Sequence, residues 1–276
     1  MYYIYYVYAI LSAALIPFLN SFYPILKQSY SWWLVPVLFL GFMLGFVVLQ
    51  FLILLVMILS TNREKKPRAT SFFIFLLKNC LALIIKIVRV EINAEGLEKF
   101  PEDSRVLLVC NHQHDFDPAV ILSAFPNAQL AFIGKKEIYN EMPFISCVMH
   151  RINSLLIDRE NDREAAKTII NAIKTIKEDT ASIAIFPEGY TSPTCELLPF
   201  RNGCFKIAIK ANVPIAVCVL NNTREIPKNL FRKKTVVDFK LLDVITPEQF
   251  EGKNTTEIGD NIHKQMLDAL EKLRNK

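Results

Sequence analysis

Two histidines and two aspartates stand in one short polar stretch after an apolar run. The stretch NHQHDFD, residues 111–117, directly follows RVLLVC, residues 105–110. If Asp117 lies in the first turn of a helix, its carboxylate can reach back to the imidazole of His112. That contact fixes the tautomer and leaves the other ring nitrogen free to take a proton from a hydroxyl group. The spacing is that of a general base, and it is also that of an ordinary hydrogen-bonded loop.

A metal site is the alternative use of the same histidines. His112 and His114 form an HxH pair, and imidazole is a common metal ligand. Position 116 is Phe, however, and only His150 and His263 remain elsewhere in the chain. The short supply of further ligands favours acid–base chemistry, so we expect neither a metal nor a bound cofactor.

Two further polar segments follow apolar runs in the same way. FPEGYTS, residues 186–192, follows the apolar run ASIAI. In NSLLIDR, residues 153–159, Asp158 and Arg159 follow the apolar run LLI. Because the carboxyl ends of parallel strands meet at one edge of a sheet, FPEGYTS is expected near the His112 loop. Gly189 has no side chain, which lets its backbone approach a phosphate group.

Alternating strand and helix patterns occupy the chain from about residue 90 onward. The strand candidates are RVLLVC, SLLIDR, ASIAIF, VPIAVCVL and TVVDFKLLDV, and helical patterns cover residues 163–178 and 254–273. This alternation predicts an α/β sandwich around a largely parallel sheet. A segment of about 190 residues is long enough to bury one hydrophobic core.

The N-terminal part is much more apolar than the rest. Hydrophobic residues make up 52% of the 276 residues, and the mean hydropathy is positive. In residues 32–60, Gln50 is the only strongly polar side chain before the end of the run. As a helix rising ~1.5 Å per residue, this run exceeds the ~30 Å core of a bilayer. Residues 2–26 form a second apolar run, which contains Pro17 and Pro24. Together the two runs predict a transmembrane helical hairpin. A cleaved signal peptide is disfavoured because no basic segment precedes the first residues of this run.

Aromatic and basic residues mark the ends of the second apolar run. Trp32 and Trp33 stand at its start, and TNREKKPR, residues 61–68, follows it. The segment between the two apolar runs holds only one basic residue, Lys27. Since basic residues concentrate on the cytoplasmic side, both chain ends are expected in the cytosol.

The segment SFFIFLLKNCLALIIKIVR, residues 71–89, predicts a further helix. One narrow stripe of this helix collects most of its polar residues, and the members of the stripe are Ser71, Lys78, Ala82, Lys86 and Arg89. Such a helix can lie in the membrane interface with its basic stripe towards anionic head groups. A buried helix packed on the following domain is the alternative.

Charge and cysteine content limit the classes of partner. The net charge of +5 fits an anionic membrane surface or a phosphate-bearing substrate, and no basic and aromatic module for nucleic acid is present. The six cysteines show no CxxC pairing and lie mostly in apolar runs, which is typical of reduced, buried thiols.

Four ordered segments resemble the motifs of a known family. NHQHDFD, NSLLIDR, FPEGYTS and VPIAVCV are similar to the NHxxxxD, GxxFIxR-like, FPEGTRS and VPI motifs of the 1-acylglycerol-3-phosphate acyltransferase family, the lysophosphatidic acid acyltransferases among glycerolipid acyltransferases. GKKEIYNEMPFI and PFRNGCFKIA also look like the segments between these motifs. The resemblance covers about residues 90–242, and four motifs in order are far more specific than any one of them.

The resemblance implies transfer of an acyl chain from a thioester, acyl-CoA or acyl carrier protein, to the free hydroxyl of lysophosphatidic acid. It implies His112 as the general base and Asp117 as the residue that orients it, without a covalent acyl-enzyme. At matched positions, Arg159, Glu188 and the backbone of Gly189 are implied to bind the glycerol phosphate head. From the residues alone, Arg159 can instead pair with a neighbouring carboxylate on the surface, and Glu188 can cap the turn after its strand.

The resemblance and the hydropathy together divide the chain into three parts. Residues 1–62 are expected to form a two-helix membrane anchor, residues 63–89 a basic link and interfacial helix, and residues 90–276 the acyltransferase domain. The expected protein is integral to the cytoplasmic membrane, with its catalytic domain facing the cytosol and its lysophospholipid acceptor among the membrane phospholipids.

The third motif departs from the family where the acceptor should be bound. Tyr190 and Thr191 replace the usual Thr-Arg, so a cation that would hold a phosphate is missing, and Asn153 replaces the usual Gly of the second motif. Basic residues that could replace the lost charge are Lys135, Lys136, Arg201 and Lys206. Another lysophospholipid or a glycolipid is therefore an alternative acceptor. A non-catalytic membrane scaffold is the alternative from a different class, against which the intact HxxxxD motif argues.

Overall fold

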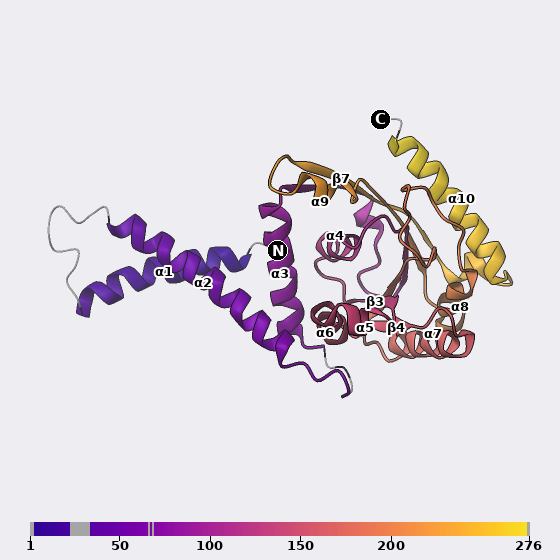
Figure 1. Cartoon of the computed structure of the whole chain (residues 1–276), viewed down its shortest axis with the longest axis horizontal. Coiled ribbons are helices and arrows are strands. Elements are labelled where there is room, and N and C mark those ends of the chain that lie inside the picture. The colour runs from indigo at the N-terminus through magenta and orange to yellow at the C-terminus, as the bar shows by residue number, and fades with distance from the viewer. Residues whose placement is uncertain (1–2, 23–33, 66, 68, 275–276) are drawn as a thin grey trace.

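The computed structural model describes residues 3–22, 34–65, 67 and 69–274 (Figure 1). A pair of long helices and a third helix precede an α/β domain, and the pair projects from the domain on one side. Five residues used above to predict the membrane interface and the orientation lie outside the described residues. They are Lys27, Trp32, Trp33, Lys66 and Arg68.

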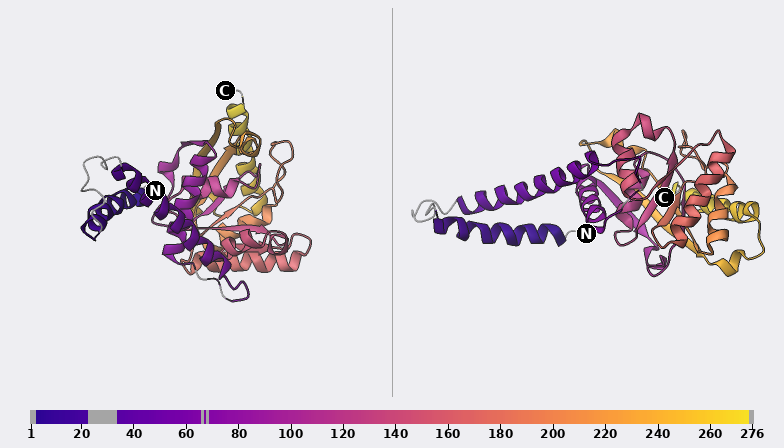
Figure 2. Two further views of the ribbon diagram at one scale, coloured as in Figure 1. Left: turned by 60° about the vertical axis from the view of Figure 1, so that its left-hand side comes forward. Right: turned by 90° about the horizontal axis from the view of Figure 1, so that it is seen from below.

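The two projecting helices are α1, Tyr3–Phe22, and α2, Leu34–Leu59. Both are long and apolar enough to cross a membrane, and Figure 2 shows them side by side. The hydroxyl of Tyr8 donates to Oε1 of Gln50 at 3.0 Å, and the amide of Gln50 donates to Sγ of Cys80 at 3.1 Å. The polar Gln50 therefore joins α1 and α2 to the next helix, which explains how it lies in an otherwise apolar run.

Helix α3, Ser71–Ile87, packs on the α/β domain. It begins at Thr70, whose hydroxyl accepts the backbone N–H of Phe73 at 3.3 Å, as an N-cap residue does. Its exposed large apolar side chains are Phe72, Phe75, Ile84 and Ile87.

The prediction that Lys78 faces lipid head groups is wrong. Its ammonium group is buried and donates to three backbone carbonyl oxygens, those of Phe125, Pro126 and Ala128, at 3.0, 2.8 and 2.6 Å. These carbonyl groups replace the water around the charge, and burial still lowers the pKa of Lys78 to about 8. The basic stripe is thus split, with Lys86 and Arg89 exposed and Lys78 inside.

The end of α2 is also fixed to the domain. Arg151 donates to the hydroxyl of Thr61 at 2.8 Å and to the carbonyl oxygen of Met57 at 3.0 Å. The guanidinium of Arg63 lies over the ring of Tyr139, 3.9 Å from its centroid, and donates to the backbone carbonyl of the same residue. The basic flank of the apolar run therefore contacts the α/β domain.

In the described part of the chain, one seven-stranded sheet forms the centre of the domain, in the order β1-β7-β6-β2-β5-β3-β4. The strands are β1 Val90–Glu95, β2 Leu107–Cys110, β3 Leu130–Lys135, β4 Leu155–Ile157, β5 Ser182–Ile185, β6 Ile215–Asn221 and β7 Thr235–Ile245. Neighbouring strands are parallel except β6 and β7. The predicted α/β fold around a largely parallel sheet is confirmed, and β1 and β3 are additional strands.

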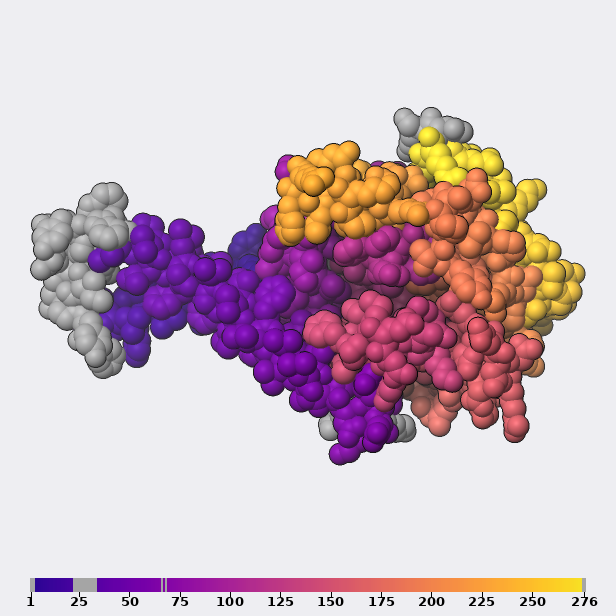
Figure 3. Space-filling model, viewed as in Figure 1, coloured from indigo at the N-terminus to yellow at the C-terminus, as the bar shows by residue number. Residues whose placement is uncertain are grey.

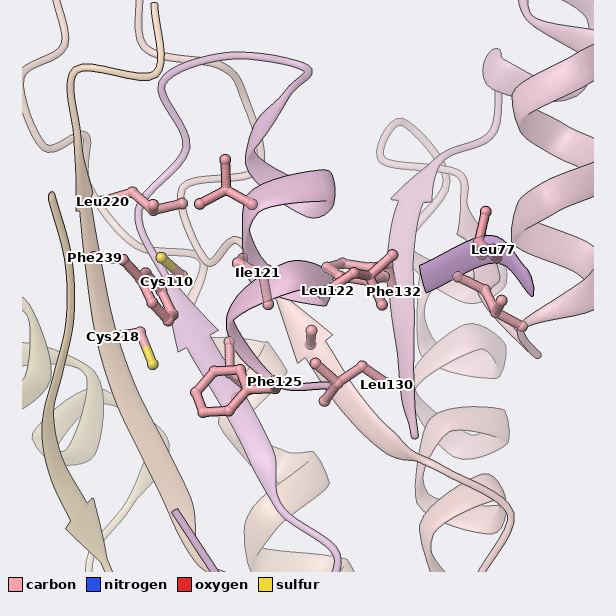
Figure 4. Close-up of a cluster of buried hydrophobic side chains, with 14 of the residues drawn as sticks. Leu77, Cys110, Ile121, Leu122, Phe125, Leu130, Phe132, Cys218, Leu220 and Phe239 are labelled. Carbon is pink, nitrogen blue, oxygen red and sulfur yellow. The ribbon is translucent and has the colours of Figure 1, made fainter. Parts of the chain in front are cut away.

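Helices cover both faces of this sheet. On β2, Leu108 and Cys110 pack towards α3 and α4, whereas Leu107 and Val109 pack towards the opposite helices, as the two-residue period of a strand requires. Figure 4 shows side chains of α4 against those of the strands on the first face. The helices are α4 Asp117–Ala124, α5 Ile138–Glu141, α6 Pro143–Arg151, α7 Asp162–Lys177, α8 Lys206–Ala211, α9 Glu225–Asn229 and α10 Thr255–Arg274.

Candidate active site

The His112 loop lies between the end of β2 and the start of α4. Nδ1 of His112 is 2.8 Å from Oδ2 of Asp117, the first residue of α4. The same carboxylate oxygen accepts the backbone N–H groups of Gln113 at 2.6 Å and His114 at 3.0 Å. Asp117 is fully buried, whereas 15% of the His112 side chain is exposed. Because a carboxylate only accepts, Nδ1 carries the proton and Nε2 is left as the basic nitrogen.

Aromatic contacts fix the plane of the His112 ring. The ring stacks on Phe186, with 4.2 Å between centroids and 14° between planes. Phe186 directly follows β5, so the neighbouring strand limits the rotation of the imidazole. His114 turns away, stacking on Phe116 and accepting the backbone N–H of that residue at 3.3 Å. The two histidines of the HxH pair therefore have separate surroundings.

Glu188 joins the third motif to the His112 loop. Its side chain is buried, and its two oxygens accept the backbone N–H groups of His112 at 2.6 Å and Leu198 at 2.8 Å. The backbone N–H of Ser192 donates to the carbonyl oxygen of His112 at 2.9 Å. Burial raises the pKa of Glu188 to about 7, against the lowering effect of the two N–H donors. The carboxylate therefore joins the framework of the two loops, and its predicted contact with the acceptor stays a prediction.

Asn111 is a framework residue that sequence reasoning missed. Its amide donates to the carbonyl oxygen of Leu220 at 2.9 Å and accepts the N–H of the same residue at 2.7 Å. This pair of bonds continues the β2–β6 pairing one residue beyond the strand, directly before His112. The signal in the sequence was its place as the Asn of the NHxxxxD motif.

A cavity of about 580 Å³ opens beside the third motif; its lining is mostly apolar but includes four basic side chains, for which it is called the cationic cavity. Its polar lining includes Arg159, Arg201, Lys206 and Lys210 together with Asp162, and isoleucines of α7 form part of its wall. The pocket brings two of the predicted binding residues together, Arg159 and Gly189, but not Glu188. A cavity with four cations and one carboxylate favours an anionic ligand.

Gly189 is required by both backbone conformation and space. Its φ angle is +76°, in the left-handed region, and a Cβ at this position would lie 3.0 Å from Cδ and Nε of Arg201. The backbone N–H of Arg201 donates to the carbonyl oxygen of Pro187 at 2.8 Å, which holds the two segments together. A larger residue would be strained at this φ angle and would also push the Arg201 side chain slightly aside.

Tyr190 lies between two arginines. The guanidinium carbons of Arg159 and Arg201 are each 5.3 Å from the centroid of its ring, and Arg201 donates to its hydroxyl at 3.2 Å. Burial lowers the pKa of Arg159, so its charge has lost hydration that an anion can replace. The alternative surface pairing of Arg159 is not observed, because Asp158 pairs with Lys136 at 3.1 Å.

The structure shows how the positions that depart from the family motifs are accommodated. Asn153 has a φ angle of +59°, a conformation that Asn tolerates better than most residues and that Gly adopts readily. The turn of the second motif is therefore kept. Lys135 pairs with Glu141 at 3.1 Å, whereas Arg201 and Lys206 line the cavity.

A second cavity, of about 660 Å³, is almost entirely apolar. It lies between α2, α3, α4 and α6, and its polar lining is limited to His112, Asp115 and a few backbone and sulfur atoms. Phe186 and Ile133 line both cavities, so the two spaces lie on either side of these residues. An apolar space at a general base, next to a cationic one, suits a substrate with a hydrocarbon chain and an anionic group.

Fold and site together define an α/β transferase with a His-Asp pair. Residues 91–221 match the family model described as Acyltransferase. The 1-acyl-sn-glycerol-3-phosphate acyltransferase of Escherichia coli K12 is 31% identical over 168 residues, covering 60% of this chain and 67% of that protein. The enzyme of the same name from Saccharomyces cerevisiae is 27% identical over 205 residues, covering 73% of this chain and 64% of that protein.

The fold has a solved counterpart. The crystal structure of the 1-acyl-sn-glycerophosphate (LPA) acyltransferase PlsC from Thermotoga maritima superposes with a TM-score of 0.63 at 22% identity, over 81% of this chain and 88% of that one. The chain belongs to the 1-acylglycerol-3-phosphate acyltransferase family of glycerolipid acyltransferases, as its four motifs predicted. It spans 64% of the length of the yeast relative and of a Caenorhabditis elegans relative.

Proposed function

We propose that the protein is a membrane-bound O-acyltransferase that converts lysophosphatidic acid into phosphatidic acid. The observation that carries the proposal is the His112–Asp117 pair, bonded at 2.8 Å, on the wall of an apolar cavity that adjoins a cationic one. The names of the relatives from E. coli and yeast agree with this activity.

The chemistry follows from the geometry of the His112 loop. Nε2 of His112 takes the proton of the acceptor hydroxyl while the oxygen attacks the carbonyl carbon of the thioester. The C–S bond then breaks, and the imidazolium returns the proton to the departing sulfur. Asp117 stabilises the imidazolium and holds its tautomer. The co-substrate is acyl-CoA or acyl carrier protein, no covalent acyl-enzyme forms, and no cofactor takes part.

The apolar cavity is the proposed site of the acyl chain. Its walls come from the membrane helix α2, the helix α3 and helix α6, so a chain can pass from the bilayer side towards His112. Burying each methylene of a chain in such a space contributes about 0.8 kcal/mol. This gain supports binding of a long-chain donor without any specific polar contact.

The cationic cavity is the proposed site of the acceptor phosphate. Among the described residues, Arg159 and Arg201 form no ion pair with a carboxylate, so their charges are available to a ligand. A guanidinium can bind a phosphate through two N–H groups at once. We infer that Arg201 supplies the charge that Thr191 lacks, and that the Gly189 backbone approaches the same group.

The proposed location is the cytoplasmic membrane, with the catalytic domain in the cytosol. Arg63 and Lys65, which directly follow α2, support this orientation. It is tested by a cysteine introduced at Asp268 on α10, in a variant whose native cysteines are replaced by serine. A membrane-impermeant maleimide should label this cysteine only after intact cells are permeabilised. Efficient labelling of intact cells would reverse the proposed orientation.

A different acceptor is the second candidate, because Tyr190 and Thr191 stand where the family motif has Thr-Arg. Purified protein in nanodiscs should be given labelled acyl-CoA with lysophosphatidic acid, lysophosphatidylcholine, lysophosphatidylglycerol or a glycolipid. We expect labelled phosphatidic acid from the parent protein and none from His112→Ala. Transfer only to another acceptor would establish the second candidate, and transfer to none of them from acyl-CoA or acyl carrier protein would favour a scaffold.

A further inference from the structure

The turn between α9 and β7 carries an exposed aromatic side chain. Phe231 is 67% exposed and has a φ angle of +59°, a conformation that bulky residues rarely adopt. An exposed phenyl ring in a strained turn gains nothing from the folded domain itself. Such a combination indicates a contact that the isolated chain does not contain.

The turn is held rigidly despite this strain. The carbonyl oxygen of Asn229 accepts the N–H groups of Arg232 at 2.9 Å and Lys233 at 3.1 Å. The side chain of Asn229 is buried and donates to the hydroxyl of Thr235 at 3.0 Å. Leu230 packs against the hydrophobic core. The phenyl ring is therefore kept on the surface by bonds on both sides of it.

Positive charges surround the ring. Exposed basic side chains in and beside the turn are Lys228, Arg232, Lys233 and Lys234. Lys228 pairs with Glu225 and Lys234 with Glu91, whereas Arg232 and Lys233 have no ion pair among the described residues. The tip thus combines one apolar ring with two cations that are outside any ion pair of the described residues.

The turn lies at the end of α3, on the side of the domain from which the hairpin projects. The N–H of Thr235 donates to the carbonyl oxygen of Arg89 at 3.0 Å, two residues after α3 ends. Figure 3 shows this orange segment next to the end of α3, and Figure 1 shows the same placement. Ile84 and Ile87, in the last turn of α3, are also exposed.

We propose that the turn formed by residues 228–234 is a second membrane contact of the domain. Phe231 inserts at the boundary between head groups and acyl chains, and Arg232 and Lys233 bind the phosphates of anionic phospholipids. The hairpin is fixed to the domain at the end of α2, so the hairpin and the domain can tilt together in the bilayer. A contact at the far end of α3 removes that freedom and fixes the domain against the bilayer. The proposal does not depend on the acyl-transfer activity.

Tryptophan fluorescence in lipid vesicles tests the contact. The parent is the full chain with Trp32→Phe and Trp33→Phe, reconstituted in phosphatidylcholine with or without phosphatidylglycerol. Phe231→Trp reports on the turn, and Leu267→Trp on α10, at the opposite side of the domain, is the matched control (Figure 1). Lipids brominated on the acyl chain quench only indole rings that reach the hydrocarbon. The charge variant is Arg232→Gln with Lys233→Gln.

We expect bromolipid quenching at position 231 to exceed that at position 267 by at least about threefold in anionic vesicles. Quenching should fall towards the control value in phosphatidylcholine alone and in the charge variant, since both remove the electrostatic attraction. Equal quenching at the two positions would overturn the membrane contact. Strong quenching at position 231 that ignores both the anionic lipid and the charge substitutions would overturn the role of the cations.

Discussion

The cluster of Arg159, Tyr190 and Arg201, called the Tyr190 cluster, lies on the opposite side of Phe186 from the His112 loop. The two regions are built differently. In the loop, the carboxylates of Asp117 and Glu188 are buried and bonded to backbone N–H groups at 2.6 to 3.0 Å. In the cluster, two arginines contact one tyrosine ring at 5.3 Å on a wall of an open cavity. Short bonds among buried groups define one geometry, whereas long cation–π contacts tolerate several.

This difference separates two functions. A loop whose polar groups are fixed before the substrate arrives suits a proton transfer that needs a defined position of Nε2. A cluster of one partly buried and one exposed arginine suits recognition of a charged head group, because its side chains can adjust. Substitutions in the loop should therefore lower kcat for every acceptor, and substitutions in the cluster should change the preference among acceptors.

Removal of the base should have the largest effect. His112→Ala should reduce acyl transfer by roughly 100-fold or more, because it removes the imidazole that takes the proton of the acceptor hydroxyl. Expression and membrane insertion should stay close to normal, because the imidazole lies in a loop and is partly exposed. Transfer is measured with labelled acyl-CoA in nanodiscs, and thermal unfolding checks the fold. A variant that keeps most of the activity would contradict the proposed mechanism.

Asp117→Asn should be nearly as severe. The amide stabilises an imidazolium less than a carboxylate does and can hold the wrong tautomer, so kcat should fall by about 100-fold or more. Asp115→Asn is the matched control, because Asp115 is exposed and the side chains of His112 and His114 are bonded to Asp117 and to the backbone of Phe116 instead. If the change at position 115 has the greater effect on kcat, His112 is oriented by the other aspartate.

Much of the loop could be predicted from the sequence, and little of the cluster. The HxxxxD spacing is local, so the pairing of His112 with Asp117 needs only a strand, a turn and a helix start. β2, β5 and β6 are fully buried apolar runs, which the sequence marks clearly. β1 was not predicted although its residues alternate between apolar and polar, because the run is short and most of its side chains are partly or fully exposed.

Contacts between distant segments account for the errors. Lys78 points inward because the carbonyl groups that bind it belong to a turn about 50 residues later, which helical periodicity alone cannot reveal. In the same way, Arg159, Tyr190 and Arg201 come from three separate segments. Four basic residues were equally plausible substitutes for the missing arginine until the fold paired Lys135 and Lys136 with carboxylates.

Glu188 links the two regions and should give an intermediate effect. In Glu188→Gln, one amide end cannot accept a backbone N–H, so the bond to His112 or to Leu198 is lost and kcat should fall by about 10-fold. A KM for lysophosphatidic acid that stays within about twofold would assign Glu188 to positioning. A rise in KM with unchanged kcat would instead support direct contact with the acceptor.

The raised pKa of Glu188 adds a dependence of stability on pH. Its folded pKa of about 7 exceeds the ordinary 4.5, so the folded state binds more protons between these values. Ionisation of Glu188 therefore costs stability as pH rises, and the full cost, on the order of 1–3 kcal/mol, is present above pH 7. Between pH 5 and pH 8, the free energy of unfolding of the parent should fall relative to that of Glu188→Gln.

Arg201 should affect the preference among acceptors and leave the chemistry nearly unchanged. In Arg201→Gln, kcat/KM for lysophosphatidic acid should fall by about 10-fold relative to an acceptor without a phosphomonoester, because one charge-assisted contact is lost. Arg201→Lys should retain part of the preference. The ratio between acceptors is measured within each variant, so changes in folding or donor binding cancel. An equal loss for both acceptors would place Arg201 in the framework with Glu188.

Restoring the family arginine is the companion test and should have the smallest effect. Thr191→Arg should raise kcat/KM for lysophosphatidic acid relative to uncharged acceptors, and by more in the Arg201→Gln background than in the parent. The reason is that a second guanidinium gains little where Arg201 already binds the phosphate, but replaces a missing charge where it does not. A gain that is the same in both backgrounds would mean that positions 191 and 201 act on different groups, and the cluster would then lose its role as a substitute for the missing arginine.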